Sequence, residues 1–178
     1  MRDRSSVSHD SPRSFAGALL PVWLVTAIWD AICATALSVL AYGSTAAALW
    51  GGVAATAIGA RAISLGDAGV AAGLAIHAAV ALIWSAIFVA AARAWLPLRR
   101  AIRTPTGALA VAAMYGPLIW LVMSLAVIPL ATGRPPGFGF RWWVQVLAHI
   151  PFVSLPLVFT TRHVLAGETV PRTVERSP

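Results

Sequence analysis

Long runs of apolar residues alternate with short polar segments along this chain. Four of the runs carry almost no charge, at about 16–41, 68–92, 107–130 and 142–163. A helix needs about 20 apolar residues to cross roughly 30 Å of hydrocarbon. The pattern therefore predicts an all-α fold, a transmembrane four-helix bundle in which each run is one span.

A fifth apolar stretch lies within residues 44–66, between the first two spans. It is short and glycine-rich before Arg61, and a fifth crossing would place the arginine-rich segment around Arg99 on the outer side of the membrane, against the positive-inside rule. We therefore expect a short interfacial or re-entrant helix after the first span.

Composition supports a membrane environment for the middle of the chain. Hydrophobic residues make up 59% and charged residues 11% of the 178 residues, compared with about 45–50% and about 25% in a typical soluble domain. Residues 1–14 are polar and mixed in charge, which predicts a disordered cytoplasmic N-terminus. Residues 15–166 form the expected membrane domain, and residues 167–178 a mobile cytoplasmic tail.

Charge sets the expected orientation. The formal net charge is +7, and every basic residue is an arginine. With four spans and the N-terminus inside, only Arg61, Arg134 and Arg141 fall outside. This asymmetry predicts a multi-pass protein of a bacterial inner membrane with both termini cytoplasmic. The lipid bilayer is then the expected partner, and nucleic acid is not, because the arginines flank apolar runs instead of forming a basic patch with exposed aromatic residues.

Small residues recur every fourth position in the spans, which predicts the faces where helices pack, because lipid gives no hydrophobic drive for association. In the second span this stripe holds Gly69, Gly73, His77 and Ala81, and Gly116 belongs to a similar stripe in the third. The segment 69–73, GVAAG, has the glycine spacing of a helix-association motif. It fits packing within one chain as well as a homodimer or a larger membrane complex.

Ionisable side chains within the spans form the expected polar cluster. At about 1.5 Å per residue, Asp30, His77 and His149 lie at similar depths, roughly 11–16 Å from the outer ends of their spans. Ser124 and Tyr115, on the third span, are candidate additions to this cluster. The prolines of HIPFVSLP, residues 149–156, predict a kinked helix, either beside a polar cavity or as a plain packing feature.

Four stretches together resemble an uncharacterised family of small bacterial four-span integral membrane proteins. They are AIWDAICA, AGLAIHAAVALIW, MYGPLIWLVMSLAVIPL and AHIPFVSLPLVF followed by an arginine. Proteins of this type often hold asparagine at the position of Ser124. The resemblance implies the four-span architecture and no specific activity.

Several functions suit an intramembrane cluster of Asp30 with histidines. One is structural or accessory: the carboxylate and a histidine bond to each other and fix the helix register. A second is a proton-coupled small transporter, since histidine titrates near neutrality and ionisable groups in membranes generally mark functional sites.

A third hypothesis is a haem or metal site. His77 and His149 would supply axial nitrogens to a cofactor such as haem b, and Asp30 would orient one imidazole ring. An enzyme is less expected, because no nucleophile motif surrounds Ser85, Ser124 or Ser154. No cofactor is predicted from these residues alone.

Overall fold

The computed structural model describes residues 13–166, and these are helical with short connections. Four helical segments are long and apolar enough to cross a membrane: Phe15–Ala41, Asp67–Ala94, Pro105–Thr132 and Phe140–Leu165. A shorter apolar helix, Ala46–Ile58, follows the first. The predicted all-α, four-span fold with a short helix after span one is confirmed, and each span ends within two residues of its expected limit. Of the expected disordered N-terminus, residues 1–12 lie outside the described residues, as does the whole expected mobile tail, residues 167–178.

Three of the four spans contain a π-helical turn, which ends the first span and lies within the third and the fourth. The first consists of α1 (Phe15–Ala36) and η1 (Leu37–Ala41), and the third of α5 (Pro105–Val122), η3 (Met123–Val127) and α6 (Ile128–Thr132). The fourth consists of α7 (Phe140–His149), η4 (Ile150–Ser154) and α8 (Leu155–Leu165). The second span is α3 (Asp67–Ala94), and the remaining elements are α2 (Ala46–Ile58), η2 (Ala60–Leu65) and α4 (Leu96–Ala101).

Local sequence signals set where several helices begin and end. The hydroxyls of Ser14, Thr45 and Thr104 each accept a bond from the backbone N–H three residues later, at 3.0–3.1 Å, and so cap α1, α2 and α5. Gly59 and Gly133 adopt positive φ angles of 82° and 67° directly after α2 and α6. Only glycine takes this conformation at little cost, so both helices stop there.

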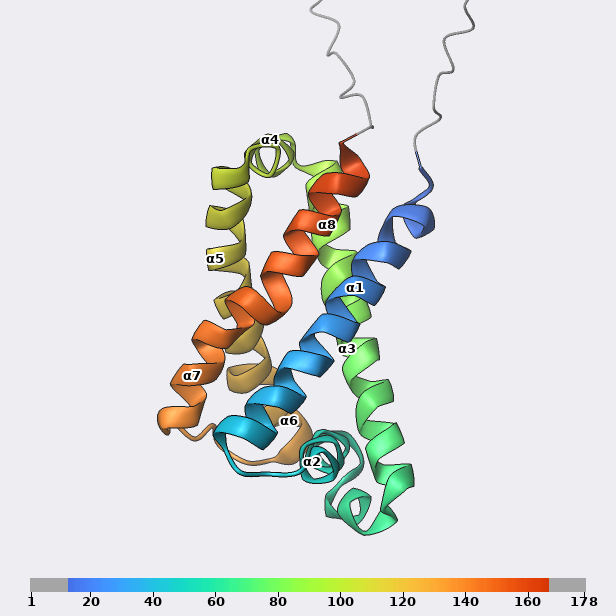
Figure 1. The fold of residues 1–178 in the computed structure, drawn as a ribbon, viewed down its shortest axis with the longest axis vertical. Helices are drawn as coiled ribbons and strands as arrows, with labels where there is room; N and C mark the ends of the chain where they lie inside the picture. Colours follow the sequence, from blue (N-terminus) through green and yellow to red (C-terminus); the bar gives the residue numbers. More distant parts are fainter. Residues whose placement is uncertain (1–12, 167–178) are drawn as a thin grey trace, which may run out of the picture.

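The four spans run side by side, with α4 and both ends of the described chain at one end of the bundle (Figure 1). At the opposite end α2 is seen along its axis, so it lies across the bundle. The helix α2 thus covers this end of the bundle, which agrees with the expectation that it does not cross the membrane. Large apolar side chains, such as Leu20, Ile28 and Met114, are exposed on the outer faces of the spans, as a lipid-facing surface requires.

The hydrophobic core fills the half of the bundle nearer α4. Its cluster joins α1, α3, the region of α4, α5 and α8 through the buried side chains Ala18, Val22, Phe88, Val89, Ala92, Ile102, Ala108, Ala112, Leu157, Val158, Val164 and Leu165. Between this cluster and α2 the spans do not pack fully against one another, and a partly open cavity lies between them.

Candidate functional site

A cavity of about 380 Å³ lies inside the bundle and is walled by every span and by α2. The polar or aromatic side chains in its wall are those of Thr26, Asp30, Thr56, His77, Trp84, Trp120 and His149. The other wall residues are apolar, among them Val53, Val80 and Ile119. Three of the side chains expected to form a polar cluster, Asp30, His77 and His149, therefore share one cavity.

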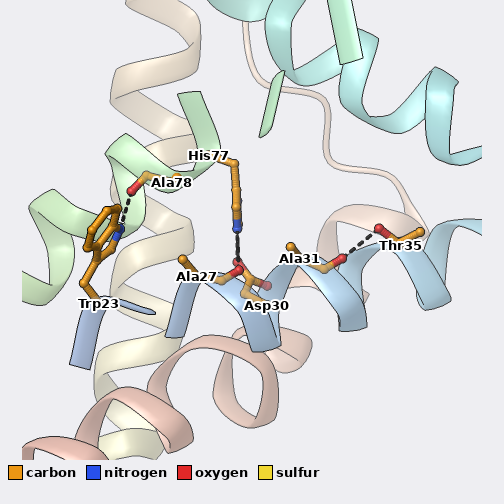
Figure 2. A network of polar contacts seen from close by, with 7 residues as sticks. All are labelled: Trp23, Ala27, Asp30, Ala31, Thr35, His77 and Ala78. Carbon is orange, nitrogen blue, oxygen red and sulfur yellow. Dashed lines mark hydrogen bonds and ion pairs between the residues drawn. The ribbon is translucent and has the colours of Figure 1, made fainter. Parts of the chain in front are cut away.

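Asp30 and His77 come together across the contact between α1 and α3 (Figure 2). His77 Nε2 lies 3.2 Å from the carbonyl oxygen of Ala27 and 3.8 Å from Asp30 Oδ2. A carbonyl only accepts, so Nε2 carries the hydrogen of this bond. The hydrogen bond thus goes to the Ala27 backbone, whereas the carboxylate sits just beyond hydrogen-bond distance, at the range of an ion pair.

Apart from this contact with His77, the Asp30 carboxylate faces the cavity. Its side chain is 20% exposed, and that of His77 is 17% exposed. Within the described residues, no side chain is within hydrogen-bond distance of the carboxylate. A charged carboxylate at this depth in a bilayer costs free energy unless a counter-charge or a hydrogen-bond donor is near. Water or a solute in the cavity can supply that partner.

His149 reaches the same cavity from α7. Its Nδ1 donates to the carbonyl oxygen of Gln145 at 2.7 Å, and its ring packs on Trp120 with centroids 5.0 Å apart. The backbone of His149 also contacts the third span, because a Cβ at Gly116 would lie 2.6 Å from the His149 carbonyl oxygen. Gly116 thus lets α5 approach the end of α7 closely enough to close this side of the cavity.

The glycines of the second span hold α2 over the cavity. A Cβ at Gly73 would clash with the carbonyl group of Trp50 on α2, and a Cβ at Gly69 would clash with that of Ala62 in η2. Trp50 in turn packs edge-on against His77, with ring centroids 5.2 Å apart. The GVAAG segment therefore packs within the chain, and Ala81, one turn beyond His77, is buried on the same face.

Two expected members of the cluster lie elsewhere. The Tyr115 hydroxyl donates to the carbonyl oxygen of Trp84 at 3.0 Å, and its ring packs on Phe88 at the edge of the core. Ser124 is buried and lines a separate cavity of about 320 Å³, next to Trp142 and the proline turn 135–136. Neither residue lines the cavity of Asp30 and the histidines.

Sequence reasoning missed several side chains of the cavity wall. Thr26 is buried, and neither its hydroxyl nor the Trp120 indole N–H has a hydrogen-bond partner within residues 13–166. Thr26 lies four residues, or one helical turn, before Asp30, and this spacing was a signal available in the sequence. The contribution of α2 through Val53 and Thr56 had no such signal, because it depends on how α2 folds back.

The ring geometry fits a haem held between two histidines only in part. His149 has the arrangement usual for a ligand, since its Nδ1 is bonded to a carbonyl and Nε2 is left for a metal. His77 does not, because its Nε2 is the atom bonded to Ala27. Within residues 13–166, no three side chains of histidine, cysteine, aspartate or glutamate form a group suited to a metal ion. The site gives little support to haem or metal binding.

Comparison with known proteins gives no matching family model, no matching curated protein and no matching solved structure. The chemistry of the site therefore rests on its own residues.

Proposed function

We propose that this protein is a proton-coupled carrier, or the carrier subunit of a larger complex, that binds a small solute in the cavity between its spans. The observation behind the proposal is the shared cavity: a carboxylate with no hydrogen-bond donor and two histidines face one partly open space of about 380 Å³. Ligand sites typically have volumes of about 300–1,000 Å³ and mostly apolar walls with a few polar groups. Ionisable groups in such membrane cavities serve proton relays and solute pathways.

The bundle also has the parts that a carrier needs to open. The π-helical turns η3 and η4 border the cavity through Met123, Val127 and Val153, and such turns are common at functional sites. The covering helix α2 begins after Gly43 and ends before Gly59, both with positive φ. These glycines are the positions at which α2 changes direction most easily.

Water and solute access to the cavity is the property to test first. In a Cys33→Ala background, Thr56→Cys places a thiol in the cavity wall and Ile28→Cys places one on the lipid-facing side of α1, where Ile28 is 57% exposed. N-ethylmaleimide reacts with the thiolate, which forms only where water reaches it, so we expect Thr56→Cys to be labelled at least about tenfold faster in proteoliposomes. Equally slow labelling of both would overturn the proposed function.

A structural role is the second candidate, and one observation favours it. Two hydrogen bonds join α1 to α3: His77 donates to the Ala27 carbonyl and the Trp23 indole donates to the Ala78 carbonyl, at 3.2 and 2.8 Å (Figure 2). The His77 ring thus helps to hold the two spans in register. Asp30 takes no part in either bond, so this role does not account for the carboxylate.

We also propose that the protein lies in a bacterial inner membrane with both termini cytoplasmic. Within the described residues, Arg13, Arg93, Arg99, Arg100, Arg103 and Arg162 belong to the end of the bundle that carries α4 and both chain ends. Only Arg61, Arg134 and Arg141 belong to the opposite end. The positive-inside rule supports this orientation, and a reporter fused to the C-terminus that is active only in the cytoplasm tests it.

A further inference from the structure

We propose that the cavity binds a small organic cation with an apolar body, such as a quaternary ammonium ion carrying an aromatic group. This inference rests on the proposed function, because it names the class of solute that the carrier takes.

The charge of the wall favours a cation over an anion. Asp30 is the acidic residue in the wall, and among the described residues no arginine lines the cavity. The other described carboxylate, Asp67, begins α3 at the covered end of the bundle. An anion would meet the Asp30 carboxylate with no positive side chain to offset it except a protonated histidine. A cation would supply a permanent counter-charge to the Asp30 carboxylate.

The remaining wall suits the apolar body of such a cation. Trp84 and Trp120 both line the cavity, and the faces of indole rings attract ammonium groups by about 0.5–2 kcal/mol, most strongly away from water. The aliphatic side chains Val53, Val80 and Ile119 complete the wall. A quaternary ion needs no hydrogen-bond acceptors in fixed positions, so this mostly apolar lining accommodates it.

Cation binding in this cavity competes with protonation. The titratable side chains in the wall are Asp30 from α1, His77 from α3 and His149 from α7, and among the described residues α2, α5 and α6 add none. A proton on any of these three groups either adds positive charge to the wall or removes the charge of the carboxylate, and both changes weaken the attraction between the wall and a cation. Binding of the cation and binding of the proton therefore oppose each other. No covalent bond changes except the one that holds this proton.

The test uses benzyltrimethylammonium and its neutral carbon isostere, 2,2-dimethylpropylbenzene, with the purified full-length protein in lipid nanodiscs. The two probes share one shape, so their difference reports charge alone. Calorimetry should show the cation binding at least about tenfold more tightly than the isostere. The quaternary probe does not titrate, so a loss of its affinity as the pH falls from about 8 to about 5.5 belongs to the protein.

Asp30→Asn and Asp67→Asn form a matched pair of variants, each losing one carboxylate. We expect Asp30→Asn to bind the cation at least about tenfold more weakly, with isostere binding unchanged as the sign of an intact fold, and Asp67→Asn to behave as wild type. If Thr56→Cys is labelled but the isostere binds as tightly as the cation, the cavity is real and the cation proposal is wrong. Cation affinity that is independent of pH in the wild type would overturn the competition with protons, even if Asp30→Asn failed to fold.

Discussion

The indole N–H of Trp29 on α1 donates a hydrogen bond to the carbonyl oxygen of Pro151 in η4, at 3.2 Å. That carbonyl has lost its partner within the fourth span. The N–H of Leu155 bonds to the carbonyl of Ile150, and the next residue, Pro156, has no N–H to offer. A carbonyl that faces lipid without a hydrogen bond costs free energy. The Trp29 side chain of the first span therefore supplies the hydrogen bond that the Pro151 carbonyl lacks within the fourth span.

Replacing Trp29 with phenylalanine should therefore destabilise the protein more than the same change at Trp23. The Trp23 indole bonds to the carbonyl of Ala78, but Ala78 lies within the continuous helix α3 and keeps its helical donor. We expect Trp29→Phe to cost about 1–2 kcal/mol and Trp23→Phe about 0.6 kcal/mol. Thermal unfolding in detergent measures both. Equal losses would show that the Pro151 carbonyl is satisfied in another way.

The Trp29 contact also shows which parts of the fold the sequence could predict. Each span was predictable because its length and hydropathy are local properties, and HIPFVSLP was recognisable as a break because proline lacks a donor. The partner of the broken span was not predictable. Trp29 is 49% exposed, and nothing in its sequence neighbourhood distinguishes it from a tryptophan that only faces lipid.

A second prediction concerns the packing of α2 against α3 at Gly73. A Cβ at Gly73 meets the backbone of Trp50, whereas a Cβ at Gly52 on α2 meets nothing within 4 Å. Gly73→Ala must push α2 away from α3, and we expect it to cost about 1–3 kcal/mol. Gly52→Ala adds a better helix former in open space and should be neutral or stabilising by up to about 1 kcal/mol. Thermal unfolding of the two variants makes the comparison.

The same pair of variants tests whether GVAAG joins two chains. Since Gly73 contacts α2 of its own chain, Gly73→Ala should lower stability while the mass of the particle, measured by light scattering, stays that of the wild type. A change of mass in Gly73→Ala alone would place this glycine at an interface between chains.

A substitution at Tyr115 should change the stability of the core without changing access to the cavity. Its hydroxyl bonds to the Trp84 carbonyl at 3.0 Å, but Tyr115 does not line the cavity. Tyr115→Phe should cost about 0.5–1.5 kcal/mol of stability and leave the labelling rate of Thr56→Cys unchanged. A changed labelling rate would mean that Tyr115 shapes the cavity through Trp84.

The candidate site was predictable to the extent that helical rise fixes depth. Asp30, His77 and His149 were expected at one level, and all three line the cavity. Ser124 was expected there on the same basis, yet depth says nothing about the direction in which a side chain points after a helix is broken. The π-helical turn Met123–Val127 contains Ser124, and it rotates the face that a regular α-helix would have presented.

A structural role of Asp30 differs from a functional one in its effect on stability. The hydrogen bond of His77 goes to the Ala27 carbonyl, and Asp30 Oδ2 stands 3.8 Å away. Removing the carboxylate therefore breaks no hydrogen bond within the described residues and relieves the cost of an ionisable group in the membrane. We expect Asp30→Asn to unfold at or above the temperature of the wild type. His77→Phe, which keeps a ring against Trp50 but loses the donor, should cost about 0.6 kcal/mol. In a double-mutant cycle, a coupling well above about 1 kcal/mol between the two positions would make the pair a structural device and remove the reason to assign Asp30 to a solute.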